Sequence, residues 1–475
     1  ESSAWGNSSW RCQSVGRETA MLEPVVIGGG IMMRVLIIGG NAAGMSAASR
    51  LVRRSKDVEV VVFEKTREVS YAACGLPYYI ADLNPELDLM RIRPVNEFEK
   101  AGIRVHLEHE VIDVNPPEHR ITVRSLQTGE CRSEQYDKLI VSSGSSPFIP
   151  SIPGTDLPGV FTVKTLADAE SIKKHLLRQE VQNVAIIGGG YIGLEIAEAC
   201  VLQKKNVRLF EAAPRVLNGF DAEFATAVEQ ELAAHGVVVY TEAKVTGLLG
   251  RGWVQQVASG EERYDADLVI LAVGIRPNTS FVDDAVIQKE ANGALTTDSS
   301  MRTSAPDIYA AGDCSTVIHK ILKRPVYLPL GTNANKQGRL VADAILGRPV
   351  RFDNALGTTM LRCLDLELAK TGITESEAWE AGIEVGTVTV THISHARYFP
   401  DPVPITIKLC FDPATCVLLG AQLMGRKECA WRVNVFAVAI DRGMRAEELG
   451  FLDLGYAPPF ATTWDAIQVA ANAVK

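Results

Sequence analysis

Two segments of the chain follow the same plan, and this internal repeat constrains the fold more than any other feature. The first, MRVLIIGGNAAGMSAASRLVRR, has the pattern of a β-branched strand, a glycine-rich turn and a helix of small residues. A second strand, VEVVVFE, follows and ends at Glu64. The other segment, VQNVAIIGGGYIGLEIAEAC, is followed by NVRLFE, which ends at Glu211. Each segment is therefore predicted to be a βαβ unit of a parallel, nucleotide-binding sheet.

The glycine spacing in both turns matches the dinucleotide fingerprint. The first glycine makes the turn, the second lets the backbone approach a pyrophosphate, and the third lets helix and strand pack closely. The second copy carries all three glycines, whereas the first has Asn41 in the middle position. Predicted cofactor-binding residues around the first turn are Gly39, Gly40, Asn41, Ala42, Ala43, Gly44, Glu64 and Lys65. Those around the second are Gly188, Gly190, Tyr191, Ile192, Gly193, Glu211 and Gly274.

Each turn is followed about twenty residues later by an acid suited to the ribose hydroxyls, Glu64 and Glu211. Two dinucleotide sites in one chain indicate a flavin that receives a hydride from a nicotinamide, because hydride transfer is the chemistry that these cofactors share. Glu211 would repel a 2′-phosphate and so favours NADH, although Arg215 leaves NADPH open.

The composition excludes several other classes. The chain has 475 residues, of which 47% are hydrophobic and 22% charged, as in an ordinary globular protein. Its net charge of −9 disfavours a nucleic-acid partner. The most apolar stretch, residues 25–40, is interrupted by Arg34, so no membrane span is expected. Nine cysteines occur without a CxxC pair or a Cys/His metal spacing, which predicts no metal and a cytoplasmic location.

The first part of the chain is expected to lie outside the fold. Residues 1–32 lack the pattern of a secretory signal and are interpreted as a disordered or non-native extension. VVIGGG at residues 25–30 imitates a phosphate-binding turn, but no helix pattern follows it, so it is not predicted to bind phosphate.

After both fingerprints comes TSAPDIYAAGDC, residues 303–314. This order of motifs resembles the flavin-dependent pyridine nucleotide–disulfide oxidoreductases. The resemblance implies that Gly312 and Asp313 close over the flavin, with Asp313 accepting a hydrogen bond from a ribityl hydroxyl. It also implies a homodimer.

The implied fold class is α/β, with two Rossmann-like nucleotide-binding domains and a C-terminal α+β dimerisation domain. The expected boundaries follow the closing strands of each unit. They give an FAD-binding domain in two pieces (33–146 and 277–347), an inserted NAD(P)H-binding domain (147–276) and the dimerisation domain (348–475). Residues 278–347 are expected to be rich in loops.

The segment SYAACGLPYYIADL follows the first acid-bearing strand and contains Cys74. The next cysteine is Cys131, so no local disulfide can form. Cys74 must instead cycle as a mixed disulfide with a small thiol, as a persulfide or as a sulfenic acid. At the start of a helix beside an oxidised flavin, its pKa is expected to be lowered.

SYAACGLPYY and ANKQGR, residues 334–339, resemble the single-cysteine subgroup. That subgroup comprises coenzyme A-disulfide reductases, NAD(P)H polysulfide or persulfide reductases, and NADH oxidases. HARYFP and DLGYAPPF resemble the segments in which coenzyme A-disulfide reductases carry tyrosines that reach the partner's active site. The resemblance therefore implies catalytic roles for Tyr398 and Tyr456 beside Cys74. Residues implied for coenzyme A are Ser46, Arg50, Arg53 and Ser70.

Two departures from the subgroup bear on the choice of activity. Ala42 stands where the NADH oxidases carry a histidine, and Ala73 stands where coenzyme A-disulfide reductases carry an asparagine. The favoured interpretation is an FAD-dependent NAD(P)H oxidoreductase that reduces coenzyme A disulfide or polysulfide through a Cys74 mixed disulfide. One alternative is an NADH oxidase that uses a Cys74 sulfenic acid and oxygen. Another, of a different class, is a flavin-binding redox sensor.

Overall fold

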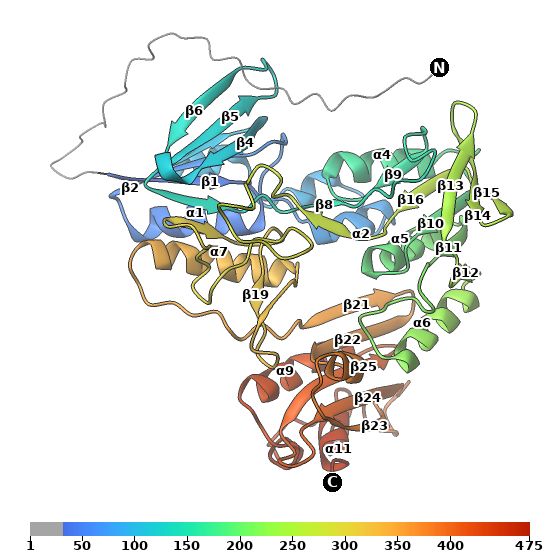
Figure 1. Ribbon diagram of the computed structural model, residues 1–475. Helices are drawn as coiled ribbons and strands as arrows, with labels where there is room; N and C mark the ends of the chain where they lie inside the picture. Colours follow the sequence, from blue (N-terminus) through green and yellow to red (C-terminus); the bar gives the residue numbers. More distant parts are fainter. Residues whose placement is uncertain (1–31) are drawn as a thin grey trace, which may run out of the picture.

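Three five-stranded sheets, each with its own helices, make up the protein (Figure 1). The computed structural model describes residues 32–475. The predictions for the extension and for the turn at residues 25–30 lie outside these residues. None of the helices between residues 32 and 475 has the length and apolar character needed to cross a bilayer.

The first sheet is parallel, has the order β18-β7-β1-β2-β3 and draws its strands from distant parts of the chain. Its strands are β1 (Met33–Ile38), β2 (Val58–Phe63), β3 (Ile103–His106), β7 (Lys138–Val141) and β18 (Ile308–Ala310). Alternating residues of β1 face opposite sides: Val35 packs toward helices α1 (Ala42–Arg54) and α7 (Gly331–Ile345). Leu36 packs toward the antiparallel sheet β4 (His109–Asn115), β5 (Arg120–Ser125) and β6 (Cys131–Gln135).

The second sheet repeats this plan with the order β12-β11-β10-β16-β9. Its strands are β9 (Val160–Thr162), β10 (Asn183–Ile187), β11 (Asn206–Phe210), β12 (Val238–Tyr240) and β16 (Leu268–Leu271). Val184 packs toward three helices, which are α4 (Leu166–Leu176), α5 (Tyr191–Leu202) and α6 (Ala222–Ala234). Ala185 packs toward the antiparallel strands β13 (Val245–Gly250), β14 (Val254–Ser259) and β15 (Glu262–Asp265).

A short antiparallel ribbon connects the two nucleotide-binding domains. It pairs β8 (Ser145–Pro147) with β17 (Ile275–Pro277), at the two points where the chain leaves and re-enters the first domain. Helix α2 (Leu76–Ile80) belongs to the first domain but packs against α4 and α5 of the second. The ribbon and α2 therefore fix how the two domains face each other.

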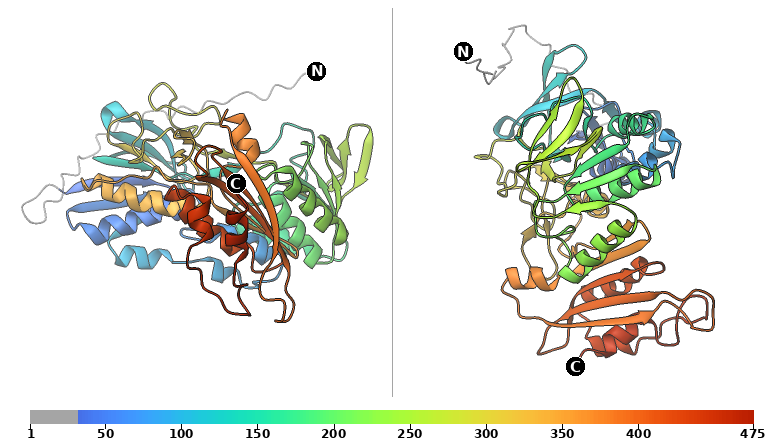
Figure 2. Two further views of the ribbon diagram at one scale, coloured as in Figure 1. Left: turned by 90° about the horizontal axis from the view of Figure 1, so that it is seen from below. Right: turned by 90° about the vertical axis from the view of Figure 1, so that its right-hand side faces the viewer.

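The third sheet is antiparallel, with the order β21-β22-β25-β24-β23. Its strands are β21 (Thr359–Cys363), β22 (Leu366–Gly372), β23 (Gly386–Ile393), β24 (Pro404–Phe411) and β25 (Leu418–Gly425). Helices α9 (Val433–Asp441) and α11 (Ala466–Asn472) share a core with it. Figure 2, right, shows this domain, in orange and red, below the other two. Shorter elements are η1 (Ala73–Gly75), η2 (Leu87–Met90), α3 (Val95–Lys100), η3 (Pro116–Glu118), β19 (Val317–Ile318), β20 (Pro325–Val326), α8 (Glu375–Glu380), η4 (Ala430–Arg432) and α10 (Ala446–Gly450).

One element differs from the sequence-based expectation. Residues 278–347 were expected to be rich in loops, yet they contain the long helix α7. A Cβ at Gly338 of this helix would lie 2.2 Å from the carbonyl oxygen of Ala43, so the glycine is what lets α7 lie directly on α1. Tertiary packing thus overrides the weak helix propensity of the glycine and asparagines in this segment.

Candidate active site

The first glycine turn has the geometry that a dinucleotide needs. Gly39 has a φ of +100°, and a Cβ there would lie 2.2 Å from the carbonyl oxygen of Ser142. A Cβ at Gly44 would lie 2.0 Å from the carbonyl oxygen of Gly39, so strand and helix pack as closely as the fingerprint requires. Helix α1 begins without a capping side chain or a first-turn acid. Its N-terminal amides and positive dipole end are therefore free for a phosphate.

The second turn is built in the same way. Cβ atoms at Gly188 and Gly193 would lie 2.3 Å from the carbonyl oxygen of Ala272 and 2.0 Å from that of Gly188. A Cβ at Gly190, in contrast, would meet nothing within 4 Å. Helix α5 also starts without a capping side chain or a first-turn acid. The middle position thus opens onto free space beside a bare helix N-terminus, and the residues fit a bound pyrophosphate.

The two acids hold their own turns with matching hydrogen bonds. Glu64 accepts from the amide of Gly40 at 2.7 Å and from that of Thr66 at 2.8 Å. Glu211 accepts from the amide of Gly189 at 2.7 Å and from that of Ala213 at 2.8 Å. Each carboxylate oxygen has a second lone pair, so both acids can also accept from ribose hydroxyls.

The remaining predicted nucleotide-binding residues surround these turns. Tyr191 is partly buried, and its hydroxyl hydrogen-bonds with Oγ1 of Thr359 in β21 at 3.1 Å. Ile192 is exposed at the start of α5, and Lys65 is exposed beside Glu64. Gly274 has a φ of +108° and free space where a Cβ would lie.

Asp313 lies where the first and second domains meet. Its Oδ2 accepts from Ser145 Oγ at 2.9 Å and pairs with Lys164 Nζ at 3.3 Å. The amide of Gly312, whose φ is +83°, donates to Gln337 of α7 at 2.9 Å. The Gly312–Asp313 pair is thus held by the β8 ribbon on one side and by α7 on the other. This arrangement fits a loop that closes over a cofactor on the first sheet.

Cys74 lies in η1, immediately before α2, and so at the contact between the two nucleotide-binding domains. Three residues earlier, Tyr71 donates to the carbonyl oxygen of Lys164 at 3.2 Å. Burial raises the pKa of Tyr71 to about 12, and nearby Glu64 adds to this shift. The segment with the cysteine is therefore anchored across the domain boundary.

The pKa of Cys74 corrects one expectation. Part of the side chain is accessible to solvent, but desolvation by the surrounding protein raises the pKa of the thiol, and Glu195 and Asp313 raise it further. Lys164 opposes them. The polypeptide alone therefore does not lower the pKa of the thiol as predicted. Desolvation and the two acids raise this pKa by more than Lys164 lowers it.

Two acids near the cysteine were missed by the sequence-based analysis. Glu195 and Glu198 of α5 line a small cavity together with Tyr78, on the helix that follows Cys74. Burial raises the pKa of Glu195 to about 7, and Glu198 contributes. Glu198 in turn accepts from Arg362 Nε of β21 at 2.9 Å. The signal was present in the sequence, because these acids interrupt an otherwise apolar helix, YIGLEIAEACVL.

Tyr398 and Tyr456 lie together on the third domain. Their hydroxyl oxygens are 2.5 Å apart, and the two side chains are 77% and 44% exposed. We call their segments the Tyr398 loop (residues 394–400) and the Tyr456 loop (residues 455–460). The structure thus brings the two tyrosines together and leaves both side chains accessible to solvent.

The residues expected to bind coenzyme A have partners within the protein. Arg50 pairs with Asp343 of α7 at 2.6 Å, so its guanidinium is already neutralised. Ser46 Oγ donates to Oδ1 of the α7 residue Asn335 at 2.9 Å. Arg53 Nε donates to the carbonyl oxygen of Ser49 at 2.8 Å and remains exposed.

Ser70 adopts a left-handed conformation, with a φ of 50°. Its amide donates to the carbonyl oxygen of Gly40 at 2.9 Å. Ser70 therefore lies next to the first glycine turn, four residues before Cys74.

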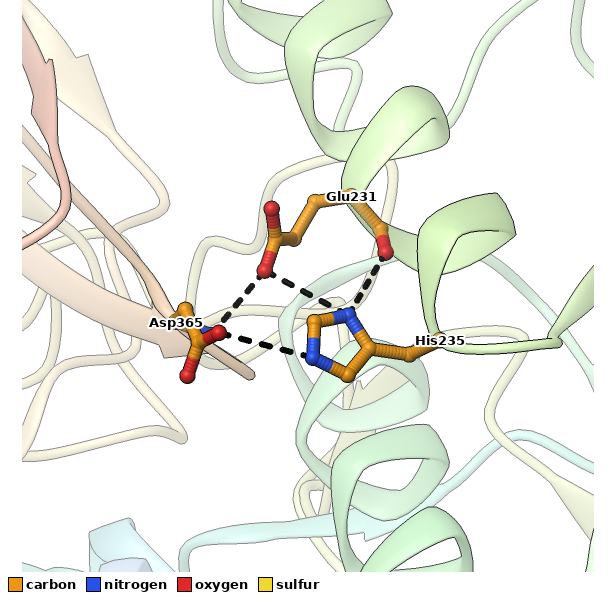
Figure 3. A group of neighbouring side chains, drawn as sticks. All are labelled: Glu231, His235 and Asp365. Atoms are coloured by element: carbon orange, nitrogen blue, oxygen red, sulfur yellow. Dashed lines mark hydrogen bonds and ion pairs between the residues drawn. The ribbon is translucent and has the colours of Figure 1, made fainter.

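Three potential metal ligands meet between the second and third domains (Figure 3). Glu231 lies on α6 and His235 follows the end of that helix, with its Nε2 3.5 Å from Asp365 Oδ2. Arg426 is 3.3 Å from Glu231 and 3.5 Å from Asp365. This arginine already supplies the positive charge that the two carboxylates need. We interpret the group as a polar contact that fastens α6 to the β21–β22 turn.

Two dinucleotide-binding domains that share a boundary, with a redox-capable thiol at that boundary, define a two-cofactor oxidoreductase. Residues 33–338 match the model for "Pyridine nucleotide-disulphide oxidoreductase", and residues 361–466 match that family's dimerisation domain. The chain belongs to the pyridine nucleotide-disulphide oxidoreductase family. The predicted fold class and the identification as an enzyme are therefore confirmed. Its cofactors are FAD and a nicotinamide nucleotide.

Individual relatives cover almost the whole chain. The chain is 40% identical to the "NAD(P)H sulfur oxidoreductase (CoA-dependent)" of Pyrococcus furiosus, over 93% of this chain and 99% of that protein. It is 31% identical to an "NADH oxidase" of Enterococcus faecalis, over 93% and 99%. The reduced CoADR-RHD of Bacillus anthracis superposes with a TM-score of 0.90 at 32% identity, over 93% of this chain and 80% of that one.

Proposed function

We propose that the protein is an FAD-dependent NAD(P)H oxidoreductase that reduces coenzyme A disulfide or polysulfide, or a persulfide, through a Cys74 mixed disulfide. The observation that carries this proposal is the place of Cys74. It is the exposed one among the eight cysteines in the described part of the chain, and it lies where the two nucleotide-binding domains meet. The name of the Pyrococcus furiosus relative, a CoA-dependent sulfur oxidoreductase, supports the same substrate class.

The proposed chemistry at Cys74 has two steps. The thiolate attacks one sulfur of the substrate disulfide or sulfur chain, forms a mixed disulfide and releases the first thiolate. When bound, FAD and NAD(P)H supply the electron pair that cleaves this mixed disulfide, which releases the second thiol and restores the Cys74 thiolate. Asp313 and Lys164 hold the domain boundary in place, at a mutual distance of 3.3 Å.

The tyrosine pair completes the site from a second subunit in this proposal. Both tyrosine side chains are exposed, and the third domain matches a dimerisation model. A homodimer would place Tyr398 and Tyr456 against the partner's Cys74. There a tyrosine hydroxyl can protonate a departing thiolate without bringing in a net charge.

The finer binding assignments depend on charges that remain free. For coenzyme A phosphates we favour Arg53 over Arg50, because Arg50 is paired with Asp343. Ser46 and Ser70 remain proposed contacts. Glu211 favours NADH over NADPH because its carboxylate would face a 2′-phosphate.

The cysteines bear on the proposed location. Free thiols support a reducing, cytoplasmic setting, and seven of them are Cys74, Cys200, Cys314, Cys363, Cys410, Cys416 and Cys429.

The main alternative is an NADH oxidase in which Cys74 becomes a sulfenic acid and oxygen is the acceptor. The Enterococcus faecalis relative bears that name. Ala42, at the start of α1, carries no imidazole and so argues against this alternative. A flavin-binding redox sensor would contain the same cofactors and turn over slowly.

The deciding experiment is the intact mass of the purified protein under denaturing conditions, with and without a thiol reductant. The proposal expects one coenzyme A per chain that the reductant releases and that Cys74→Ser lacks. Cys131→Ser is the matched control and should keep the adduct, since Cys131 lies on β6, away from the domain boundary.

A second measurement separates the alternatives. The proposal expects NADH consumption that depends on added coenzyme A disulfide or polysulfide and is lost in Cys74→Ser. A bare mass or one added oxygen, with rapid NADH loss in air, would favour the oxidase. Bound flavin without turnover on any acceptor would favour the sensor.

A further inference from the structure

One arginine joins the two loops that carry the tyrosine pair. Arg432, the last residue of η4, is 0% exposed. Its Nη2 donates to the carbonyl oxygen of Ser394 at 2.9 Å, where the Tyr398 loop begins. The same nitrogen donates to the carbonyl oxygen of Phe460 at 3.1 Å, where the Tyr456 loop ends. A single guanidinium group therefore fixes the backbone of both loops.

Arg432 also bonds with the carboxylate of Asp465 and with a third carbonyl oxygen. Nε lies 3.2 and 3.1 Å from the two carboxylate oxygens of Asp465, and Nη2 lies 2.9 Å from Oδ2. Nη1 donates to the carbonyl oxygen of Glu428. Asp465 is itself buried and caps α11 by accepting from the amide of Ile467. A buried guanidinium with this many partners is tolerated only because its planar fork matches them all, which a lysine cannot do.

Further bonds close the Tyr398 loop and tie it to its neighbour. The buried His395 places Nε2 2.9 Å from the carbonyl oxygen of Pro400 and so links the beginning of the loop to its end. The amide of Ala396 donates to the carbonyl oxygen of Pro458 in the Tyr456 loop at 3.3 Å. The anchoring groups are buried, although the tyrosines that the loops present are not.

This arrangement explains how two exposed side chains keep their hydroxyls paired. An exposed tyrosine loses conformational entropy when it is fixed, and one surface hydrogen bond offsets little of that cost. The hydroxyl distance of 2.5 Å therefore depends on backbones that are already fixed. The hydrogen bond with Tyr398 also raises the pKa of Tyr456.

We propose that Arg432 is a positioning residue, which holds the Tyr398 and Tyr456 loops so that their hydroxyls act as one pair on the departing sulfur. This inference rests on the proposed function. In the step concerned, the leaving thiolate takes the proton of one hydroxyl, and the other hydroxyl donates a hydrogen bond to the phenolate so formed. Water then returns the proton to that phenolate.

The test compares Arg432→Lys with Arg442→Lys in the full-length holoenzyme. Arg432 directly precedes helix α9 and Arg442 directly follows it. Arg442 is the matched control because its side chain is 78% exposed. The first readout is hydrogen–deuterium exchange of both loops, which requires no substrate. Arg432→Lys should speed exchange in both loops, and Arg442→Lys in neither. His395→Gln, a milder change, should speed exchange in the Tyr398 loop alone and serves if Arg432→Lys does not fold.

The second readout is steady-state reduction of coenzyme A disulfide. We expect Arg432→Lys to lower kcat about tenfold, with KM changed less than about twofold, because the hydroxyls remain but lose their alignment. Flavin reduction by NADH should keep its rate. In a Tyr398→Phe/Tyr456→Phe background, Arg432→Lys should lower kcat no further. If Arg432→Lys acted by general destabilisation, it would lower kcat in this background as well.

The outcomes distinguish a failure of the positioning role from a failure of the proposed function. Unchanged exchange in both loops, or an equal loss of kcat in the tyrosine-free background, would refute the positioning role. Faster exchange with full disulfide turnover would show that Arg432 holds the loops but that the tyrosine pair is not used, and so would overturn the catalytic part of the proposal. Turnover retained in Cys74→Ser would overturn the proposed function itself while leaving the exchange result intact.

Discussion

Alanine at two glycines of the second turn should separate folding from nucleotide binding. Gly193→Ala puts a Cβ 2.0 Å from the carbonyl oxygen of Gly188, whereas Gly190→Ala puts one into free space. Overpacking against backbone costs up to about 3 kcal/mol, and alanine recovers about 1 kcal/mol of helix propensity at position 193. The net expected loss for Gly193→Ala is about 2 kcal/mol.

The assay pairs thermal unfolding with NADH titration. A loss of about 2 kcal/mol corresponds to a decrease in Tm of about 4–8 °C for a cooperative folding unit of about 150–250 residues. Gly190→Ala, with a φ of −79° at the substituted residue, should change Tm little, because losing the glycine N-cap costs at most about 1 kcal/mol. It should weaken NADH binding about tenfold or more, because its methyl group occupies the pyrophosphate space.

The result that would refute this reasoning is the reverse pattern. If Gly193→Ala unfolds at the wild-type temperature, the strand and helix do not need the close approach. If Gly190→Ala binds NADH with wild-type affinity, the open space at that glycine is not where the pyrophosphate lies.

Three further predictions concern charged groups. Glu195 has a pKa raised to about 7, so the folded protein binds a proton that the unfolded chain releases; stability should fall as pH rises from about 4.5 to about 7, by up to roughly 3 kcal/mol. Glu195→Gln should remove this fall, and denaturant unfolding at pH 5 and pH 8 checks it. Lys408 contacts Asp221, Glu223 and Glu375 at 3.0, 2.8 and 2.6 Å. Lys408→Met should destabilise the protein by about 3–5 kcal/mol, as measured by Tm, whereas Lys408→Arg should destabilise it less because the positive charge remains. Glu211→Ala should raise kcat/KM for NADPH relative to NADH by about tenfold or more, as measured by steady-state kinetics with each nucleotide.

Local sequence patterns were sufficient for the two nucleotide-binding turns. The paired units around Gly39 and Gly188 could be predicted because strand, glycine spacing, helix and acid all lie within about thirty consecutive residues. The acids were correctly placed at the ends of the second strands, but their hydrogen bonds to the glycine turns were not foreseen. That detail depends on the side-chain conformation, which spacing does not fix.

What the sequence did not reveal depends on residues that are distant along the chain. Arg50 was expected to bind coenzyme A, and its ion pair with Asp343 was not foreseen because Asp343 lies on α7, a helix that was not predicted. The pKa of Cys74 was expected to be lowered by its helix, but Glu195 comes from another domain. Arg432 had no motif at all, because its role arises from carbonyl groups on three separate segments.

The contacts of α5 and α6 have a mechanical consequence. Asp221, Glu231 and Glu198 each bond across to the third domain, through Lys408, Arg426 and Arg362 respectively. Three ion pairs thus join the second and third domains. The second domain also shares one apolar core with α2 of the first domain and with β21 and β22 of the third. Force applied to the third domain would therefore be carried through this core into both nucleotide-binding domains.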